Sequence, residues 1–593
     1  MSYTAPIKDM RFVINEIAGL EQLNALPAFE MASPDLVDTV LDEAGRLAAE
    51  VLAPTNWPGD QAGTRVENDA VVVPEVFREA YRQFLEGGWP ALPCNPEYDG
   101  QGLPHVVATA AMEMWKSANL AFSLCPMLTH GAVEALEAHG SDELRRLYLP
   151  KLISGEWTGT MNLTEPQAGS DLAAITTRAV PAGDHYRITG RKIYITWGDH
   201  DLTDNVIHLV LARLPDAPAG VKGISLFLVP KFLLDAEGRP GERNDVKPIS
   251  VEHKLGIHGS PTCVMSYGDD GGAIGYLVGE ENNGLACMFT MMNHARLAVG
   301  VEGLSISERA YQLALAYARD RVQGYLPGEA ERVRIIRHPD VRRMLLTMKA
   351  SIEAMRALAY VASASLDFSH QAEDAALKAH HQARIDLLTP VVKGWCTELG
   401  QEMASLGVQI HGGMGYVEET GAAQHLRDSR ITTIYEGTTG IQANDLAGRK
   451  IVRDGGRAMA SLIAEMRETQ AELAAAGGPH AGIATRLAEG IDALEASVQW
   501  LLETAGRDPH AMGSAGVNLL MLTGTVAGGW LMGRGALAAA RRLDQGDNDR
   551  EYLEAKLVTA RFYAEHMLPR AGAYRQAILA GTESLMALTE EQF

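Results

Sequence analysis

Four short runs decide the fold, namely His185-Tyr-Arg-Ile-Thr, Lys192-Ile-Tyr-Ile-Thr, Val206-Ile-His-Leu-Val-Leu and Ile224-Ser-Leu-Phe-Leu-Val. In each of them, β-branched and aromatic residues alternate with polar ones or cluster together. Gly, Pro and Asp residues separate the runs, which is typical of strands joined by turns. The runs lie between Thr158 and Tyr276. We therefore expect a mostly antiparallel β-domain in the middle of the chain.

The sequence on either side of this region predicts helices. Ser33 and Pro34 precede a helical apolar run, which fits an N-cap followed by Pro at the first helical position. After the β-region come three long amphipathic segments, which suit an antiparallel helix bundle. They run from Leu285 to about Arg321, from Pro339 to Ser369 and from Ala372 to Gly407. Beyond a Gly/Ala-rich stretch, 471–483, that resembles a linker, the pattern is again helical.

The predicted fold class is therefore mainly α with a central β-domain. We expect four domains: an N-terminal helical domain (1–157), a middle antiparallel β-domain (158–280), a four-helix bundle (281–454) and an additional C-terminal helical domain (455–593). A chain of 593 residues is too long for one hydrophobic core, which agrees with this division.

Composition and charge argue against two classes of partner. The net charge of −23 disfavours nucleic acid and anionic membranes, since both attract clustered Lys and Arg. The five cysteines are scattered and include no Cys-x-x-Cys, which fits reduced thiols in the cytoplasm. No His-Glu-x-x-His or similar pattern predicts a metal site.

One stretch could by its length span a bilayer. From Ala511 to Gly533 the chain has no charged residue, and its glycines allow helices to approach closely. Its polar and Gly content lowers the hydropathy that membrane insertion needs. We therefore interpret the stretch as a buried helix pair in a tight bundle and expect no membrane association.

Four segments near the borders of the predicted domains carry polar groups and glycines suited to a ligand. They are Met161-Asn-Leu-Thr-Glu-Pro-Gln-Ala-Gly-Ser-Asp171, Lys192-Ile-Tyr-Ile-Thr-Trp-Gly198, Gln409-Ile-His-Gly-Gly-Met-Gly415 and Thr433-Ile-Tyr-Glu-Gly-Thr-Thr-Gly-Ile-Gln442. Taken singly, each has an ordinary structural explanation, such as a capped turn, a packed strand face or a helix C-cap.

Taken together and in this order, the four segments resemble the signature segments of the acyl-CoA dehydrogenase family. The resemblance covers about Ser33 to Arg449 and implies the same sequence of helical, β and helical domains. Val322-Gln-Gly324, Gly256-Ile-His-Gly-Ser-Pro-Thr-Cys263 and the C-terminal extension look closest to larger bacterial relatives with an extra helical domain. These include very-long-chain-type enzymes and 3-methylmercaptopropionyl-CoA dehydrogenases, and they imply a homodimer.

The resemblance implies an FAD site. Lining the flavin would be Met161, Leu163, Thr164, Gly169 and Ser170, with Tyr194 and Thr196 beside the isoalloxazine ring. Gln409, Gly412 and Gly413 would contact the adenosine diphosphate part of the FAD that is bound by the neighbouring subunit. Further FAD contacts would come from Arg321, Gln323, Thr438 and Gly440. Gln323 and Gly440 depart from the residues common at those positions.

The resemblance also implies the chemistry. The carboxylate of Glu436 would remove a proton beside the thioester carbonyl, while the flavin takes a hydride from the next carbon and leaves a trans-2-enoyl-CoA. Substrate contacts would come from Ser170, Asn293, Arg296 and Gly437. An electron-transferring flavoprotein would then accept the electrons, as in fatty-acid β-oxidation.

Three alternatives stay open at this stage. The chain could dehydrogenate 3-methylmercaptopropionyl-CoA in place of a straight-chain fatty acyl-CoA. It could be an oxidase that passes electrons to oxygen. It could also resemble relatives that bind DNA in alkylation responses, but residues 461–593 hold 11 Lys and Arg against 17 Asp and Glu, which disfavours a phosphate-binding face.

Overall fold

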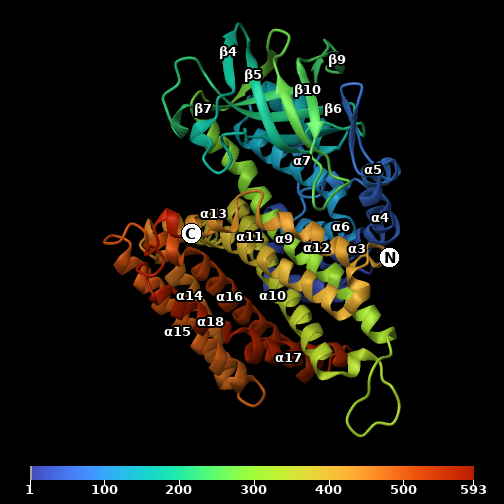
Figure 1. Ribbon diagram of the computed structural model, residues 1–593, viewed down its shortest axis with the longest axis vertical. Coiled ribbons are helices and arrows are strands. Elements are labelled where there is room, and N and C mark those ends of the chain that lie inside the picture. The colour runs from blue at the N-terminus through green and yellow to red at the C-terminus, as the bar shows by residue number, and fades with distance from the viewer. Residues whose placement is uncertain (1–2) are drawn as a thin grey trace. The chain divides into compact units, whose positions relative to one another are not determined.

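The computed structural model describes residues 3–593 and divides the chain into two compact units (Figure 1). The first unit consists mainly of Glu43–Leu103 and Met114–Ala295. The second consists of Ala5–Asp42, Pro104–Glu113 and Arg296–Phe593. The region that we predicted as an N-terminal helical domain therefore contributes residues to both units.

Most elements of the chain are helices, and the strands of one large sheet lie between the helical regions in the sequence. The helices are α1 (Ile7–Val13), α2 (Leu20–Asn24), α3 (Pro34–Leu47), α4 (Ala53–Ala62), α5 (Val76–Glu86), α6 (His105–Ala118), α7 (Leu120–His139), α8 (Asp142–Ile153), α9 (Gly284–Asp320), α10 (Pro339–Gln371), α11 (Ala375–His411), α12 (Ala422–Ser429), α13 (Thr439–Asn444), α14 (Arg457–Ala476), α15 (His480–Thr504), α16 (Ala511–Asp544), α17 (Arg550–Phe562) and α18 (Arg570–Leu579). The strands are β1 (Arg65–Glu67), β2 (Ala70–Val72), β3 (Trp157–Asn162), β4 (Arg178–Ala182), β5 (His185–Thr196), β6 (Asn205–Arg213), β7 (Ile224–Pro230), β8 (Phe232–Leu234), β9 (Pro240–Arg243), β10 (Val246–Val251), β11 (Thr262–Tyr267) and β12 (Ala273–Val278). This confirms the predicted fold class.

The first unit is built on an eight-stranded sheet, drawn in cyan and green in Figure 1. Its strand order is β10-β11-β5-β12-β7-β6-β3, with β4 pairing with β5 and β6. Most pairs are antiparallel, as predicted, but β3 and β6 run parallel. The chain forms β4 and β5 between these two strands, and so long a connection allows it to return in the same direction. Helix α7 covers β3, where Gly159 leaves no room for a side chain because a Cβ would lie 2.4 Å from that of Ala132.

A short hairpin in the N-terminal region was not predicted. β1 and β2 pair through three residues each, and the turn places Asn68 and Asp69 at φ values of 50° and 60°. Asn and Asp tolerate this left-handed conformation, which two-residue hairpin turns require. Strands of three residues are too short to show an alternating pattern, so the sequence did not predict this hairpin within the N-terminal helical domain.

The second unit contains the long helices that the sequence predicted, with small shifts at their ends. The hydroxyl oxygen of Ser33 accepts a hydrogen bond from the N–H of Leu36 at 3.3 Å, as expected of an N-cap before α3. Helix α11 ends at His411, so Gln409 lies in its last turn and not in the loop after it. The predicted linker was also wrong in part, because residues up to Ala476 belong to α14. Alanine favours the helix, and only Gly477, Gly478 and Pro479 connect α14 to α15.

The long uncharged stretch forms one helix, α16, and not the helix pair that we predicted. By length and composition, α16 is the one helix among residues 3–593 that could cross a membrane, and most of its apolar window is buried inside the protein. It packs against α10, α11, α13 and α15 within the second unit. Gly524 and Gly528 lie where a Cβ would meet the ring of Trp395, at 2.2 and 3.0 Å respectively. The glycines therefore admit a large buried ring and do not break the helix.

Replacing Gly524 by Ala is expected to destabilise the protein by about 1–2 kcal/mol, because overpacking a buried contact costs more than the gain in helix propensity. The matched control is Gly513→Ala, at an exposed position of the same helix where a Cβ meets nothing within 4 Å. The control variant should be as stable as the wild type or slightly more stable. Urea unfolding followed by circular dichroism measures both effects. Equal stability of the two variants would contradict the close packing against Trp395.

Candidate active site

Glu436 lies on a strained turn between the helical turn that ends at Thr433 and α13. Its φ is 55° and that of Gly437 is 92°, so two consecutive residues have left-handed backbones. A Cβ on residue 437 would lie 2.6 Å from Nε2 of Gln442, so glycine is required there. A non-glycine residue in this conformation costs about 1–3 kcal/mol and persists only where its surroundings enforce it.

The carboxyl group of Glu436 is tuned to titrate near neutrality. The side chain is half-buried, and its removal from water raises its pKa to about 7. The positive charges of Arg296 and Lys393 oppose this rise, while the negative charge of Glu302 adds to it. A carboxyl group with this pKa is well matched to accept a proton from a weak carbon acid near neutral pH.

Hydrogen bonds with residues of α9, α11 and α13 hold the turn. The ammonium of Lys393, on α11, donates to the carbonyl of Gly437 at 2.6 Å. The side-chain amide of Gln442 donates to the carbonyl of Glu436 at 3.1 Å. The hydroxyl of Thr439 donates to Glu398 on α11 at 2.5 Å, and that of Tyr435 donates to Glu302 on α9. These contacts surround the strained backbone on both sides.

Sequence reasoning did not find this frame of Glu302, Lys393, Glu398 and Gln442. One signal was available, since Lys393 follows Pro390-Val-Val in an otherwise apolar run and a charged residue there needs a buried partner. The partner, the carbonyl of Gly437, is 44 residues away in the sequence. Close packing makes the contact possible, because Gly303 and Gly400 bring α9 and α11 together where any side chain would clash with the backbone.

The predicted substrate residues have different environments. Arg296 is buried with an exposed fraction of 4%, and its guanidinium lies 3.8 Å from a carboxylate oxygen of Asp445. Asn293 is exposed. The carbonyl of Gly437 accepts hydrogen bonds from Lys393 at 2.6 Å and from Gln442 at 3.4 Å. The backbone N–H of Glu436 donates no hydrogen bond within residues 3–593, which leaves it available for an oxygen atom of a substrate.

In the first unit, the segment that begins with Met161 is organised by a buried ion pair. Glu165 accepts hydrogen bonds from the ammonium of Lys192 at 2.8 Å and from the amide and hydroxyl groups of Thr176 and Thr177. Burial alone would raise the pKa of Glu165, but Lys192 and these donors lower it to about 2. The carboxylate therefore stays charged and fixes the turn that follows β3. Neither Glu165 nor Lys192 was among the predicted site residues.

The predicted flavin residues of this unit present free polar groups. The hydroxyls of Thr164, Ser170 and Thr196 make no hydrogen bond within the described residues, and none of the three is fully buried. Tyr194 lies where the pairing of β5 with β11 shifts register; its φ is 59° and 61% of its surface is exposed. Gly169 is also exposed, with nothing within 4 Å of a Cβ there, whereas Met161 is buried. Free hydroxyls and an exposed aromatic ring in the same unit fit a polar-edged ring such as a flavin.

The remaining predicted FAD residues belong to the second unit. Exposed positions are occupied by Gln409, Gly412, Gly413, Arg321 and Gln323. Apart from the adjoining residues, no atom of residues 3–593 lies within 4 Å of a Cβ built on Gly412 or Gly413, so a ligand could approach their backbone closely. The guanidinium of Arg321 donates to the side chain of Gln323 at 3.2 Å. The hydroxyl of Thr438 accepts from the N–H of Ile441 as the N-cap of α13, where Gly440 lies in the first turn.

Four family models match the chain in succession. They are the acyl-CoA dehydrogenase N-terminal domain (residues 38–156), the middle domain (160–269), the C-terminal domain (282–451) and the acetyl-CoA dehydrogenase C-terminal-like domain (462–589). Together they account for most of the 593 residues, including the C-terminal extension.

Similar proteins extend over the whole chain. The 3-methylmercaptopropionyl-CoA dehydrogenase of Ruegeria pomeroyi is 50% identical over 589 residues, which cover 99% of each chain. The structure of Caenorhabditis elegans ACDH-11 in complex with C11-CoA matches with a TM-score of 0.75 and 21% identity, covering 98% of this chain and 95% of that one. A Bacillus anthracis acyl-CoA dehydrogenase complexed with FAD matches with a TM-score of 0.73 and 22% identity, covering 96% and 91%. The chain therefore belongs to the acyl-CoA dehydrogenase family, whose members are oxidoreductases acting on a CH–CH bond.

Proposed function

We propose that the protein is an FAD-dependent acyl-CoA dehydrogenase that converts an acyl-CoA thioester to the trans-2-enoyl-CoA, with Glu436 as the base. One observation carries this proposal. A half-buried carboxyl group with a pKa raised to about 7 is held on a left-handed turn in the segment that the family uses for its base. A structural carboxylate needs neither the strain nor the shifted pKa.

Proton removal beside a thioester also needs donors at the carbonyl oxygen, because charge develops there as the proton leaves. The N–H of Glu436 is free within residues 3–593 and belongs to a backbone that its neighbours hold rigid. It therefore costs little reorganisation when the substrate binds. The same residue would accept the proton through its side chain and stabilise the enolate through its main chain.

FAD, when bound, supplies the hydride acceptor for the carbon next to the deprotonated one. The residues that would hold it are Met161, Leu163, Thr164, Gly169, Ser170, Tyr194, Thr196, Arg321, Gln323, Gln409, Gly412, Gly413, Thr438 and Gly440. Their free hydroxyls, exposed glycines and exposed tyrosine ring are compatible with a large polar-edged cofactor. Ser170, Asn293, Arg296 and Gly437 would contact the acyl-CoA.

As the substrate we propose a short acyl-CoA with a thioether. The Ruegeria pomeroyi relative that is named for such a substrate is 50% identical over nearly the whole chain. Anaerobic titration of the purified enzyme with 3-methylmercaptopropionyl-CoA, butyryl-CoA and a long-chain acyl-CoA tests this through bleaching of the flavin. We expect the sulfur-containing substrate to bleach the flavin fastest. Faster bleaching by long-chain acyl-CoA would favour fatty-acid β-oxidation, and no bleaching by any of them would contradict the proposed reaction.

The wild-type enzyme should lose activity as the pH falls through about 7. Only ionised Glu436 can accept a proton, so the second-order rate constant for flavin reduction should drop about tenfold for each pH unit below that value. Stopped-flow measurements at low substrate concentration report this ionisation in the free enzyme. Flavin fluorescence recorded in parallel shows whether FAD remains bound. A rate that is constant through neutral pH would contradict a titrating base.

Several finer features complete the proposal. The reduced enzyme would pass its electrons to an electron-transferring flavoprotein, and slow reoxidation by air would distinguish it from an oxidase.

The residue ranges of the four family models support domain borders near residues 157, 280 and 454, and we further infer a homodimer. All five cysteines are free and buried, which suits the reducing cytoplasm.

A further inference from the structure

Lys393 is a buried cation that the proposed reaction does not yet use. It lies in the middle of α11 with an exposed fraction of 0%, next to the buried residues Val392 and Trp395. An ammonium group in such surroundings is costly unless it is paired and hydrogen-bonded. Within residues 3–593 its ammonium forms no salt bridge but donates to a main-chain carbonyl, that of Gly437, at 2.6 Å. The residue that it holds directly follows Glu436.

The charges around Lys393 come from three elements. Helix α9 contributes Glu302 and Arg296, α11 contributes Glu398, and the turn contributes Glu436 itself. Burial lowers the pKa of Lys393 to about 8, although the three carboxylates raise it and only Arg296 adds to the lowering. Lys393 and Glu436 thus influence each other's charge, since each is among the groups that shift the pKa of the other.

We propose that Lys393 is a positioning residue for proton abstraction, in which its ammonium clamps the carbonyl of Gly437 and so fixes the left-handed turn that aims the Glu436 carboxylate. This proposal rests on the proposed function. Gln442 supplies the complementary contact, since its side-chain amide donates to the carbonyl of Glu436. With both carbonyls held, neither peptide plane of the strained pair can rotate to a more relaxed conformation without losing a buried hydrogen bond.

The positive charge has a second consequence. It stabilises the ionised form of Glu436 and so keeps the base available at neutral pH, where burial alone would protonate it. Because Lys393 is buried behind the turn, it acts on the rate of proton removal and not on the affinity for the acyl-CoA. A lysine that merely filled space in the bundle would change stability and leave the pH dependence of the reaction unaltered.

Three variants of the FAD-loaded, full-length enzyme separate the roles of charge and hydrogen bond. Lys393→Met removes both, Lys393→Gln keeps a donor without the charge, and Lys393→Arg keeps the charge. We expect Lys393→Met to slow flavin reduction about 100-fold, because displacing a catalytic group by about 1 Å has an effect of that size. In Lys393→Met and Lys393→Gln the acid limb of the pH profile should move up by about one pH unit. The substrate dissociation constant should change less than about twofold in all three.

The alkaline side of the profile gives a sharper test. In the wild type, the rate should fall again above about pH 8, where Lys393 loses its proton. The guanidinium of Lys393→Arg keeps its charge, so this fall should disappear in that variant while the acid limb stays in place. The measurement is the same anaerobic flavin bleaching with the preferred acyl-CoA, together with flavin content and circular dichroism for each variant.

The outcomes distinguish this inference from the proposed function. If the wild type is not reduced by any acyl-CoA, the proposed function fails. If the wild type is reduced and Lys393→Met and Lys393→Gln keep its rate and its pH profile, only the positioning role fails. Should Lys393→Met not fold, the comparison of Lys393→Gln with Lys393→Arg decides in the same way. Failure of all three variants to fold would also overturn the positioning role, because the lysine would then serve the stability of the bundle.

Discussion

Replacing Glu436 by Gln is expected to slow flavin reduction by acyl-CoA about 10⁴-fold, which is the upper range for the loss of a general base. Gln has the same shape and keeps the left-handed turn, whose contacts are made by the main-chain carbonyls and not by the carboxylate. An amide, however, cannot accept the proton. FAD content, circular dichroism and the binding of an acyl-CoA should therefore stay at wild-type values while anaerobic bleaching is lost.

The matched control for this variant is Glu468→Gln, on the exposed side of α14. It removes the same charge at an exposed position and should bleach at the wild-type rate. Bleaching of Glu436→Gln at the rate of the control would remove Glu436 from the role of base. The proposed reaction would then require another proton acceptor, and within the second unit the carboxylates of Glu302 and Glu398 are the ones that the turn residues contact.

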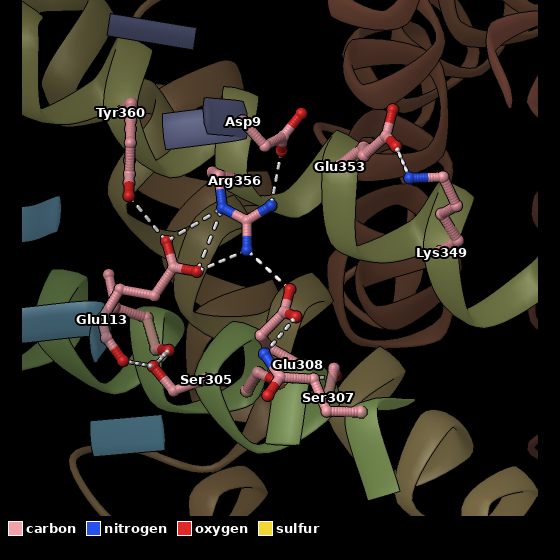
Figure 2. Close-up of polar contacts among 12 residues, drawn as sticks. Asp9, Glu113, Ser305, Ser307, Glu308, Lys349, Glu353, Arg356 and Tyr360 are labelled. Carbon is pink, nitrogen blue, oxygen red and sulfur yellow. Dashed lines mark hydrogen bonds and ion pairs between the residues drawn. The ribbon is translucent and has the colours of Figure 1, made fainter. Parts of the chain in front are cut away.

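The second large effect is expected at Arg356, the centre of a buried ion network in the second unit (Figure 2). Its guanidinium contacts Asp9 at 2.5 Å, Glu113 at 2.6 Å and Glu308 at 2.8 Å, and Tyr360 donates to Glu113 at 2.7 Å. The arginine thus pairs with three carboxylates that lie in the interior, of which Asp9 also pairs with the buried ammonium of Lys556 at 2.8 Å. These residues come from α1, α6, α9 and α10.

Replacing Arg356 by Met should lower the free energy of unfolding by about 3–5 kcal/mol, because it leaves buried carboxylates without their counter-charge. The difference in the free energy of unfolding between the wild type and the variant should become smaller as the pH falls. Burial raises the pKa of Glu113, so this carboxyl group becomes neutral as the pH falls and then no longer needs the arginine. Urea unfolding of the holoenzyme at fixed protein and FAD concentrations measures the difference at neutral and at acid pH.

Arg343→Met, on the same helix α10, is the control for the Arg356 variant. Arg343 is exposed and pairs with Asp340 at 2.8 Å, three residues away. An exposed pair of this kind contributes less than about 1 kcal/mol, so the control should unfold close to the wild type. If both variants lost the same small amount of stability, the network around Arg356 would be no more important than a surface ion pair.

Local sequence patterns determined much of the fold of this protein. The alternating residues from His185 onward predicted the sheet. A strand with one buried face needs an apolar residue at every second position, whichever strands it pairs with. The long amphipathic runs likewise predicted α9, α10 and α11. Glu436 was found through its neighbours, since a carboxylate between an aromatic residue and a glycine is conspicuous only as part of the four segments that together resemble those of the family. The hairpin at Asn68 and the single helix α16 were missed, because three-residue strands and a glycine-rich helix have weak local signals.

The frame around Glu436 was decided only by the tertiary structure. Lys393 and Gly437 are 44 residues apart, and Arg356 and Asp9 are 347 residues apart. No periodicity along the chain links such pairs, because their contact depends on how tightly whole helices pack, as at Gly303 and Gly400. The raised pKa of Glu436 has the same origin. The sequence by itself determined which carboxylate stands at the turn, whereas only the folded chain decided its strain, its burial and the charges that tune it, since all three depend on residues brought together from distant positions.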